Sequence, residues 1–146
     1  MPSPPGAVMK LRNLPVRLAT GAYILHTGWE KWHGSDERAV GIHGMAANAF
    51  PVFEAMKATD FLRMLSVGEI SLGAALLAPF VPPALAGAAL TGFSGALVTM
   101  YLRTDGLHQP RSVWPTPQGI PVSKDVWMLG IGVSLIIDGL RPRQNR

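Results

Sequence analysis

The stretch ALAGAALTGFSGALVTMYL, residues Ala84–Leu102, contains no charged residue. A surface helix of a soluble protein has an apolar face and an opposite polar face, and this stretch has no polar face. At a rise of 1.5 Å per residue, roughly 20 apolar residues cross the ~30 Å hydrocarbon core of a bilayer. We therefore interpret Ala84–Leu102 as a membrane-spanning helix rather than as a helix of a soluble bundle.

Three other apolar blocks lie along the chain, at Leu14–Trp32, Phe61–Phe80 and Val126–Leu140. The last block is short and reaches spanning length only if flanking residues such as Ser123–Asp125 are added. Charged residues make up 15% of the chain, whereas soluble domains contain roughly 25%. These features predict an all-α integral membrane protein that folds as a four-transmembrane-helix bundle.

The composition excludes several classes of function. The chain has no cysteine, which excludes disulfides, thiolate nucleophiles, iron–sulfur clusters and cysteine-ligated zinc. Its 13 Lys and Arg residues are scattered, so no basic patch indicates a nucleic-acid partner. The sequence has no phosphate-binding loop and no pair of histidines at metal-ligand spacing. We therefore predict no metal and no evident cofactor, with a quinone as the one cofactor left open.

The segments between the blocks predict how the helices connect. Asp36–Lys57 is moderately apolar but too charged to cross a bilayer, which favours an amphipathic interfacial segment of one or two helices. The turn that contains Pro79, Pro82 and Pro83 is tight, so the helices on either side are predicted to be antiparallel neighbours. Arg103–Ser123 is rich in proline, which predicts a semi-rigid surface loop.

The predicted organisation is a flexible tail at 1–13, a four-span membrane domain at 14–140 and a basic tail at 141–146. Basic residues are dense next to both ends of the membrane domain: Lys10, Arg12, Arg17, Arg141, Arg143 and Arg146. Cytoplasmic segments next to membrane spans are enriched in Lys and Arg. Both termini are therefore predicted to be cytoplasmic, in a multi-pass protein whose first partner is the lipid bilayer.

Glu69 is the clearest candidate for chemistry inside a span. It lies nine residues after Asp60, about 13 Å deep at helical rise, and an ionisable group at that depth needs a partner. The cations available in the bundle are His26, Lys31 and Arg63. Glu69 is therefore either a proton or quinone-headgroup ligand or a structural clamp between helices, and both interpretations stay open.

Three other polar groups lie within the predicted spans. His26 lies one turn before Glu30, so the two share a helix face, and we expect His26 to hydrogen-bond across the bundle. Arg17 and Asp138 lie at similar depth and are predicted to form a structural intramembrane pair. Asp138 has Arg141 in its own helix as an alternative partner.

Small residues in Ala84–Leu102 form two i,i+4 rows. One row is Ala84–Ala88–Gly92 and the other is Gly87–Thr91–Gly95. Such rows let helix backbones approach closely in membranes, so both rows are predicted to be packing surfaces.

The first two blocks resemble the motifs of a known family. Arg17-Leu-Ala-Thr-Gly21, followed by Gly28-Trp29-Glu30-Lys31, resembles the R-x3-G-x6-G-x2-K pattern that opens DoxX-family membrane proteins. Glu69-Ile-Ser-Leu-Gly73 is similar to that family's E-x2-GG stretch, with Leu72 in place of the first glycine. The resemblance covers Leu14–Leu140 and includes the layout of four spans with a long first outer loop.

The resemblance implies a location and a kind of partner. DoxX-family proteins include small subunits of a thiosulfate:quinone oxidoreductase and accessory proteins that gather redox enzymes at the bacterial plasma membrane. By this resemblance the chain is a bacterial plasma-membrane protein with other membrane or peripheral redox proteins as partners, and a homo-oligomer is also open. A family of this kind settles architecture better than activity.

Two functional hypotheses follow, with a third behind them. The first is an accessory subunit that docks a redox assembly, because the sequence carries no redox motif of its own. The second is a quinone-reactive oxidoreductase subunit of the thiosulfate:quinone type, in which Glu69 and His26 handle protons and quinone. Its candidate substrate-binding residues are Arg63, Lys31 and Glu30. The third, a small lipid or solute carrier, is disfavoured because the second block has no helix-breaking proline before Pro79.

Overall fold

The computed structural model describes residues 10–141, and the chain is helical throughout this range, with turns and loops but no β-strand. The elements are η1 (Leu11–Asn13), α1 (Leu14–Trp32), α2 (Asp36–Ala49), η2 (Pro51–Phe53), α3 (Ala58–Leu77), α4 (Pro83–Arg103), α5 (Ile120–Ser123) and α6 (Asp125–Leu140). The all-α prediction is confirmed for these residues. The predicted tails at 1–9 and 142–146, with Arg143 and Arg146, lie outside the described residues, whereas Leu11–Asn13 of the predicted tail form η1.

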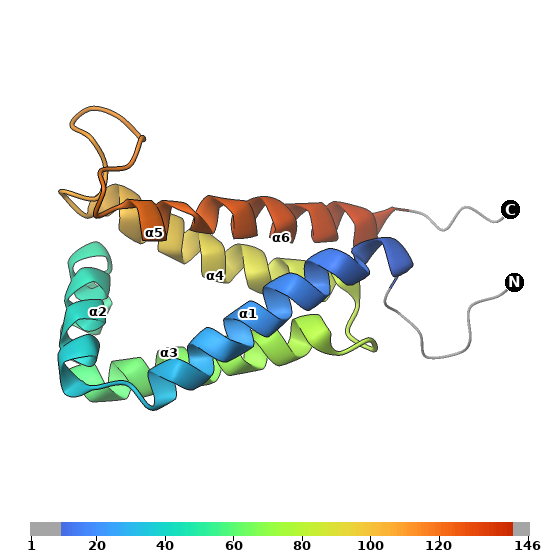
Figure 1. The fold of residues 1–146 in the computed structure, drawn as a ribbon, viewed down its shortest axis with the longest axis horizontal. Coiled ribbons are helices and arrows are strands. Elements are labelled where there is room, and N and C mark those ends of the chain that lie inside the picture. The colour runs from blue at the N-terminus through green and yellow to red at the C-terminus, as the bar shows by residue number, and fades with distance from the viewer. Residues whose placement is uncertain (1–9, 142–146) are drawn as a thin grey trace, which may run out of the picture.

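The four long helices form two pairs that run side by side (Figure 1). α1 packs against α3, and α4 packs against α6, while the two pairs touch each other much less. α2 lies across one end of the molecule, where it packs on α3 and on α4. The tight proline-containing turn does make α3 and α4 consecutive and antiparallel, but each of them packs mainly on another helix.

Glycines allow the backbones to approach closely in both pairs. A Cβ atom at Gly73 of α3 would lie 2.7 Å from the backbone nitrogen of Leu25 in α1. A Cβ atom at Gly87 of α4 would lie 2.6 Å from the carbonyl oxygen of Gly132 in α6. Both pairs therefore use the small-residue packing that is common between membrane helices.

The two predicted rows of small residues on α4 are packing surfaces only in part. Gly87 and Thr91 face α6, where a Cβ atom at Gly132 would lie 2.8 Å from the backbone nitrogen of Thr91. In the other row, Ala88 and Gly92 are exposed, and nothing lies within 4 Å of a Cβ atom at Gly92. The prediction is wrong for these two residues because α4 turns only one of its faces toward α6.

α2 confirms that the segment between the first two blocks is helical. It begins after Ser35, whose Oγ accepts a hydrogen bond from the backbone N–H of Arg38 at 3.2 Å, which satisfies a free donor of the first turn. Its inner face is made of alanines, which let it lie close to the bundle. Together with residues of α3 and α4 it forms a core cluster of Ala46, Ala49, Phe61 and Met100.

A second core cluster joins the two helix pairs. Its buried members come from all four long helices and are Ile24, Leu72, Leu76, Ala86, Leu90 and Leu135. The pairs are therefore held together by apolar contact near the middle of the bundle and toward the turn between α3 and α4.

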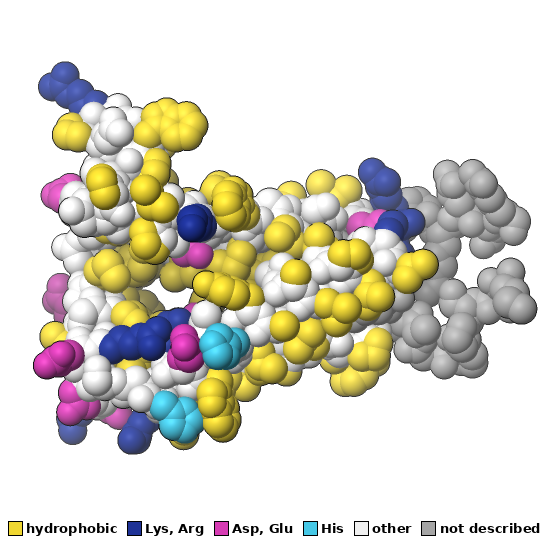
Figure 2. Space-filling view, in the orientation of Figure 1, with side chains coloured by type: hydrophobic (Ala, Val, Ile, Leu, Met, Phe, Trp, Pro, Cys, Tyr) yellow, Lys and Arg dark blue, Asp and Glu magenta, His cyan; other side chains and the backbone are white. Residues whose placement is uncertain are grey.

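The outside of all four long helices is apolar. Large exposed side chains include Leu18 and Tyr23 on α1, Val67 on α3, Leu85 on α4 and Ile137 on α6. Polar side chains are instead buried, namely Arg17, Thr20, Ser66, Glu69 and Ser94. On the face in Figure 2, charged side chains gather at the two ends of the molecule, and the stretch between them is covered by apolar and uncharged groups.

Within the described residues, two segments are long and apolar enough to cross a membrane, Pro83–Arg103 and Ile120–Leu140. The second segment joins α5 to α6, so the short last block is lengthened on its N-terminal side, as the sequence predicts. α1 and α3 are less apolar because α1 carries Arg17, Glu30 and Lys31, and α3 carries its own charged residues, Asp60, Arg63 and Glu69.

Candidate functional site

The most buried ion pair of the described residues joins α1 to α3. Nζ of Lys31 donates to Oε1 of Glu69 at 3.0 Å and to Oε2 at 2.9 Å. Oγ1 of Thr27 donates to Oε2 at 3.4 Å, and Glu69 is only 5% exposed. Of the three cations that the sequence offers as partners, Lys31 is therefore the one that Glu69 binds.

The backbone around this pair explains why the two side chains meet. A Cβ atom at Gly28 would lie 2.9 Å from Cβ of Glu69, so only glycine lets α1 approach α3 at this level. The Oγ of Ser66 donates to the carbonyl oxygen of Gly28 at 2.6 Å and fixes the crossing one turn away. Lys31 lies one turn after Gly28 and reaches Glu69 across this close contact.

Two further charged groups lie near the pair. Asp125, the first residue of α6, is close enough to Glu69 and Lys31 to interact with both charges. Arg38 of α2 adds a favourable interaction with Glu69. The sequence places Asp125 at the end of the fourth span but gives no sign that it approaches Glu69, because this proximity depends on how the two helix pairs are placed.

The other proposed site residues do not join this cluster. The side chain of His26 is 67% exposed, and its Nε2 lies 3.5 Å from Oε1 of Glu30 in the same helix. The prediction that His26 bonds across the bundle is therefore wrong, because this face of α1 points away from the other helices. Arg63 is also exposed, and it lies on the outer face of α3 rather than beside Glu69.

Arg17 binds the end of α3 instead of Asp138. It is fully buried, and its guanidinium donates to backbone carbonyl oxygens at 2.8 to 3.1 Å, those of Leu76, Val81, Ala75 and Ala78. The last carbonyls of a helix have no partner within the helix, so they are natural acceptors for a buried cation. The predicted Arg17–Asp138 pair is wrong because Arg17 faces α3, whereas Asp138 belongs to the other pair.

Asp138 instead links α6 to the start of α1. Its carboxylate accepts hydrogen bonds from Nη2 of Arg12 and, at 2.8 Å, from Nδ2 of Asn13. Nζ of Lys10 lies 3.3 Å from Oδ2. Asp138 therefore forms a staple between helices, as the sequence suggests, but with residues before α1 and not with Arg17 or Arg141.

The residues that resemble the DoxX motif share one location. Arg17, Gly21, Gly28 and Lys31 lie on the face of α1 that packs on α3, and Glu69 and Gly73 lie on the matching face of α3. Leu72, which replaces a motif glycine, points instead toward α4 and is buried between the two helix pairs. All six motif residues thus take part in joining α1 to α3.

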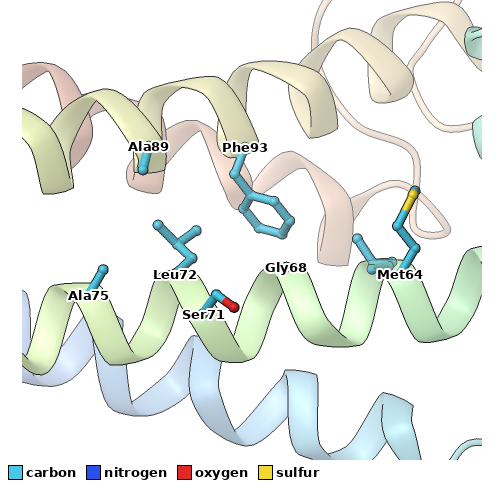
Figure 3. A pocket seen from close by; sticks show the side chains of 8 residues that line it. Met64, Gly68, Ser71, Leu72, Ala75, Ala89 and Phe93 are labelled. Carbon is cyan, nitrogen blue, oxygen red and sulfur yellow. The ribbon is translucent and has the colours of Figure 1, made fainter.

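An apolar groove lies on the other side of α3, against α4 (Figure 3). Its volume is about 500 Å³, and its lining includes Gly68, Ser71 and Ala75 of α3 with Ala89 and Phe93 of α4. Phe93 reaches across toward Gly68, and Leu72 points toward Ala89. Glu69 does not line the groove, because it faces α1.

Within residues 10–141, no group of three or more His, Asp or Glu side chains is placed to hold a metal ion. The charged cluster around Glu69 is instead suited to holding helices together. Comparison of the chain with protein-family models, curated proteins and solved structures finds no match. Membership of the DoxX family therefore stays a prediction that rests on the motif residues.

Proposed function

We propose that α1, α3, α4 and α6 all cross the bacterial plasma membrane and that the chain is a non-catalytic subunit that docks a membrane-associated redox assembly. The observation that carries the membrane part is the inverted polarity of the bundle. Arg17 and Glu69 are buried, whereas large apolar side chains cover the outside of every long helix. A soluble protein with so large an apolar surface would associate or aggregate.

The charges of α1 and α3 are compatible with a position in lipid. A lone charged residue at the centre of a span costs about 3 kcal/mol on insertion scales. Lys31 and Glu69 neutralise each other, and Arg17 gives its donors to carbonyl oxygens of α3 and the turn after it. The two helices would enter the bilayer as a pair whose interior charges are already satisfied.

The remaining charges lie at the ends of the molecule (Figure 2). α4 has 21 residues, a length of about 30 Å at helical rise, which matches the hydrocarbon core. In this arrangement α2 lies at one membrane surface, and Lys10, Arg12 and Arg141 lie at the other. The positive-inside rule then places both termini in the cytoplasm and α2 outside.

The position of Glu69 favours docking over quinone chemistry. Its carboxylate is occupied by Lys31 and Thr27, and it faces away from the apolar groove between α3 and α4. The end of the bundle with α2 offers surface for a partner, since Val113 and Trp114 of the loop after α4 are strongly exposed. We assign the docking surface to this end.

The quinone-reactive alternative has one observation in its favour, the apolar groove itself. Its volume of about 500 Å³ and its Phe93 side chain suit an isoprenoid or aromatic ligand. If a quinone binds there, Glu69 would act only from the opposite face of α3, and the exposed His26 would lie outside the site.

Membrane topology can be tested with single cysteines, because the natural chain has none. Gly41→Cys, Phe80→Cys and Val113→Cys each place a thiol outside the predicted spans. With four spans, a membrane-impermeant maleimide labels the thiols at positions 41 and 113 from one side and the thiol at position 80 from the other. If only α4 and α6 cross, positions 41 and 80 are labelled from the same side, and the four-span proposal fails.

The docking role can be tested by extraction from native membranes in mild detergent. We expect redox proteins to co-purify in fixed ratio, and to be lost when Val113 and Trp114 are both replaced by Ser. Phe80→Ser, at the opposite end, is the control and should leave the complex intact. Turnover of an electron donor with quinone by the purified chain alone would overturn the docking role in favour of catalysis.

A further inference from the structure

A second groove lies between the two helix pairs, on the side where α1 meets α6. It has a volume of about 470 Å³, and its lining comes from the start of α1 and the middle of α6: Arg12, Asn13, Val16, Trp127, Gly130, Ile131, Ser134 and Leu135. α1 diverges from α6 toward the end that carries α2 (Figure 1), so the groove lies where the two helices begin to separate.

One end of this groove is positively charged. Arg12 lines it, and the Arg12 side chain is 61% exposed even though it donates to Asp138. A guanidinium has five N–H donors in a planar fork, so the single Nη2 contact to Asp138 leaves donors available. Lys10 also lies here, with Arg141 exposed nearby in sequence, so three cations stand against the one carboxylate of Asp138.

The rest of the groove is mainly apolar. Val16, Ile131 and Leu135 extend away from Arg12 toward the middle of the bundle. If α1 and α6 cross the membrane, Arg12 lies level with the lipid headgroups, and these apolar side chains lie level with the acyl chains. The groove thus combines a cationic end with an apolar body in the order that a phospholipid presents its own parts.

We propose that this groove binds one anionic phospholipid, with the phosphate at Arg12 and Lys10 and an acyl chain along Val16, Ile131 and Leu135. The inference rests on the proposed crossing of the membrane by α1 and α6. An anionic lipid is favoured over a zwitterionic one because Asp138 neutralises only part of the local positive charge. Arg also binds phosphate through paired N–H donors, which gives geometric selectivity.

The groove between α3 and α4 provides an internal comparison. Its lining has no charged side chain, so it offers nothing that distinguishes one headgroup from another. Selectivity for an anionic lipid is expected only from the groove between α1 and α6.

The test is native mass spectrometry of the full chain in mild detergent, with phosphatidylglycerol or phosphatidylcholine added. We expect one retained phosphatidylglycerol per chain and weaker retention of phosphatidylcholine. Arg12→Gln should lower phosphatidylglycerol retention about fivefold, the effect of one basic residue near a lipid surface. Arg111→Gln, at the opposite end of the molecule, should leave it unchanged.

A second pair of variants tests the groove without removing charge. Ile131→Trp should fill the groove and reduce retention, whereas Ala89→Trp should fill only the groove between α3 and α4 and leave retention unchanged. Equal retention of the two lipids, or displacement of the lipid by millimolar inorganic phosphate, would overturn the proposal. A chain that keeps four spans in the cysteine-labelling test but retains no phosphatidylglycerol overturns the lipid site alone.

Discussion

The pair α1/α3 and the pair α4/α6 are joined by the same packing but by different polar chemistry. In both, glycines bring backbones into contact, at Gly28 and Gly73 in one pair and at Gly87 and Gly132 in the other. Only α1/α3 adds buried charge, through Arg17 and through Lys31 with Glu69.

The polar groups of α4 are satisfied within that helix. The Oγ of Ser94 donates to the carbonyl oxygen of Leu90 at 2.6 Å, and Oγ1 of Thr99 donates to that of Gly95 at 2.8 Å. Close backbone packing is therefore enough to join two helices here, and the charges of α1/α3 add orientation and register to a contact that glycine already allows. This difference predicts that charge substitutions act on one pair and glycine substitutions on both.

The largest effect is expected from Glu69→Leu. This change leaves Lys31 buried without a partner, and breaking a buried ion pair costs about 3–5 kcal/mol. The unfolding free energy in mixed micelles, measured by circular dichroism during SDS titration, should fall by that amount. Glu30→Gln is the matched control, because Glu30 is half exposed and pairs with His26 in its own helix.

The double variant Lys31→Met with Glu69→Leu separates a clamp from a reactive carboxylate. It removes both charges and keeps the volume, so most of the lost stability should return. Co-purification of partner proteins should return with it. If stability returns but the activity of the assembly stays lost, Glu69 has a chemical role and the clamp interpretation is wrong.

Arg17→Lys should have the next largest effect. Lysine keeps the charge but lacks the planar fork that reaches the carbonyl oxygens of Leu76 and Val81 together. Leaving such buried acceptors unmet should lower the unfolding free energy by about 2–3 kcal/mol. The same SDS titration measures it, and a loss no greater than that of Arg63→Lys on the exposed face of α3 would contradict the role assigned to Arg17.

Glycine substitutions test the feature that the pairs share. Gly73→Ala and Gly87→Ala each place a methyl group within 3 Å of the partner backbone, and each should lower stability by about 2 kcal/mol. Gly68→Ala and Gly92→Ala are matched controls on the same two helices, because nothing lies within 4 Å of a Cβ atom there. Their helix propensity predicts a gain of up to about 1 kcal/mol. A large loss in only one pair would show that the packing is not equivalent.

The sequence predicts elements of this fold well where a single segment decides them. The uncharged stretch Ala84–Leu102 lies within α4, and the helical nature of Asp36–Lys57 is recovered in α2 and η2. It does not predict which helices pair. Short connections suggest that α3 packs on α4, yet Gly73 and Glu69 face α1, so complementary glycines decide the pairing rather than loop length.

The candidate site follows the same division. The need of Glu69 for a cation is readable from its depth and charge, and Lys31 is one of three partners that the sequence offers. The partners of Arg17 are not predictable, because they are backbone carbonyl oxygens and carry no sequence signal. The approach of Asp125 to Glu69 is not predictable either, because it depends on the placement of one helix pair against the other.

The smallest effect is expected from Asp138→Asn, at the contact between the two pairs. Lys10 and Arg12 are partly exposed, so the loss of stability should stay below about 1 kcal/mol and should shrink further at high salt. The same change removes the carboxylate that competes with a lipid phosphate for Arg12. Phosphatidylglycerol retention in native mass spectrometry should therefore rise while stability falls slightly. A fall in both would mean that Asp138 positions Arg12 for the lipid, and that the staple and the proposed lipid site act as one unit rather than as competitors.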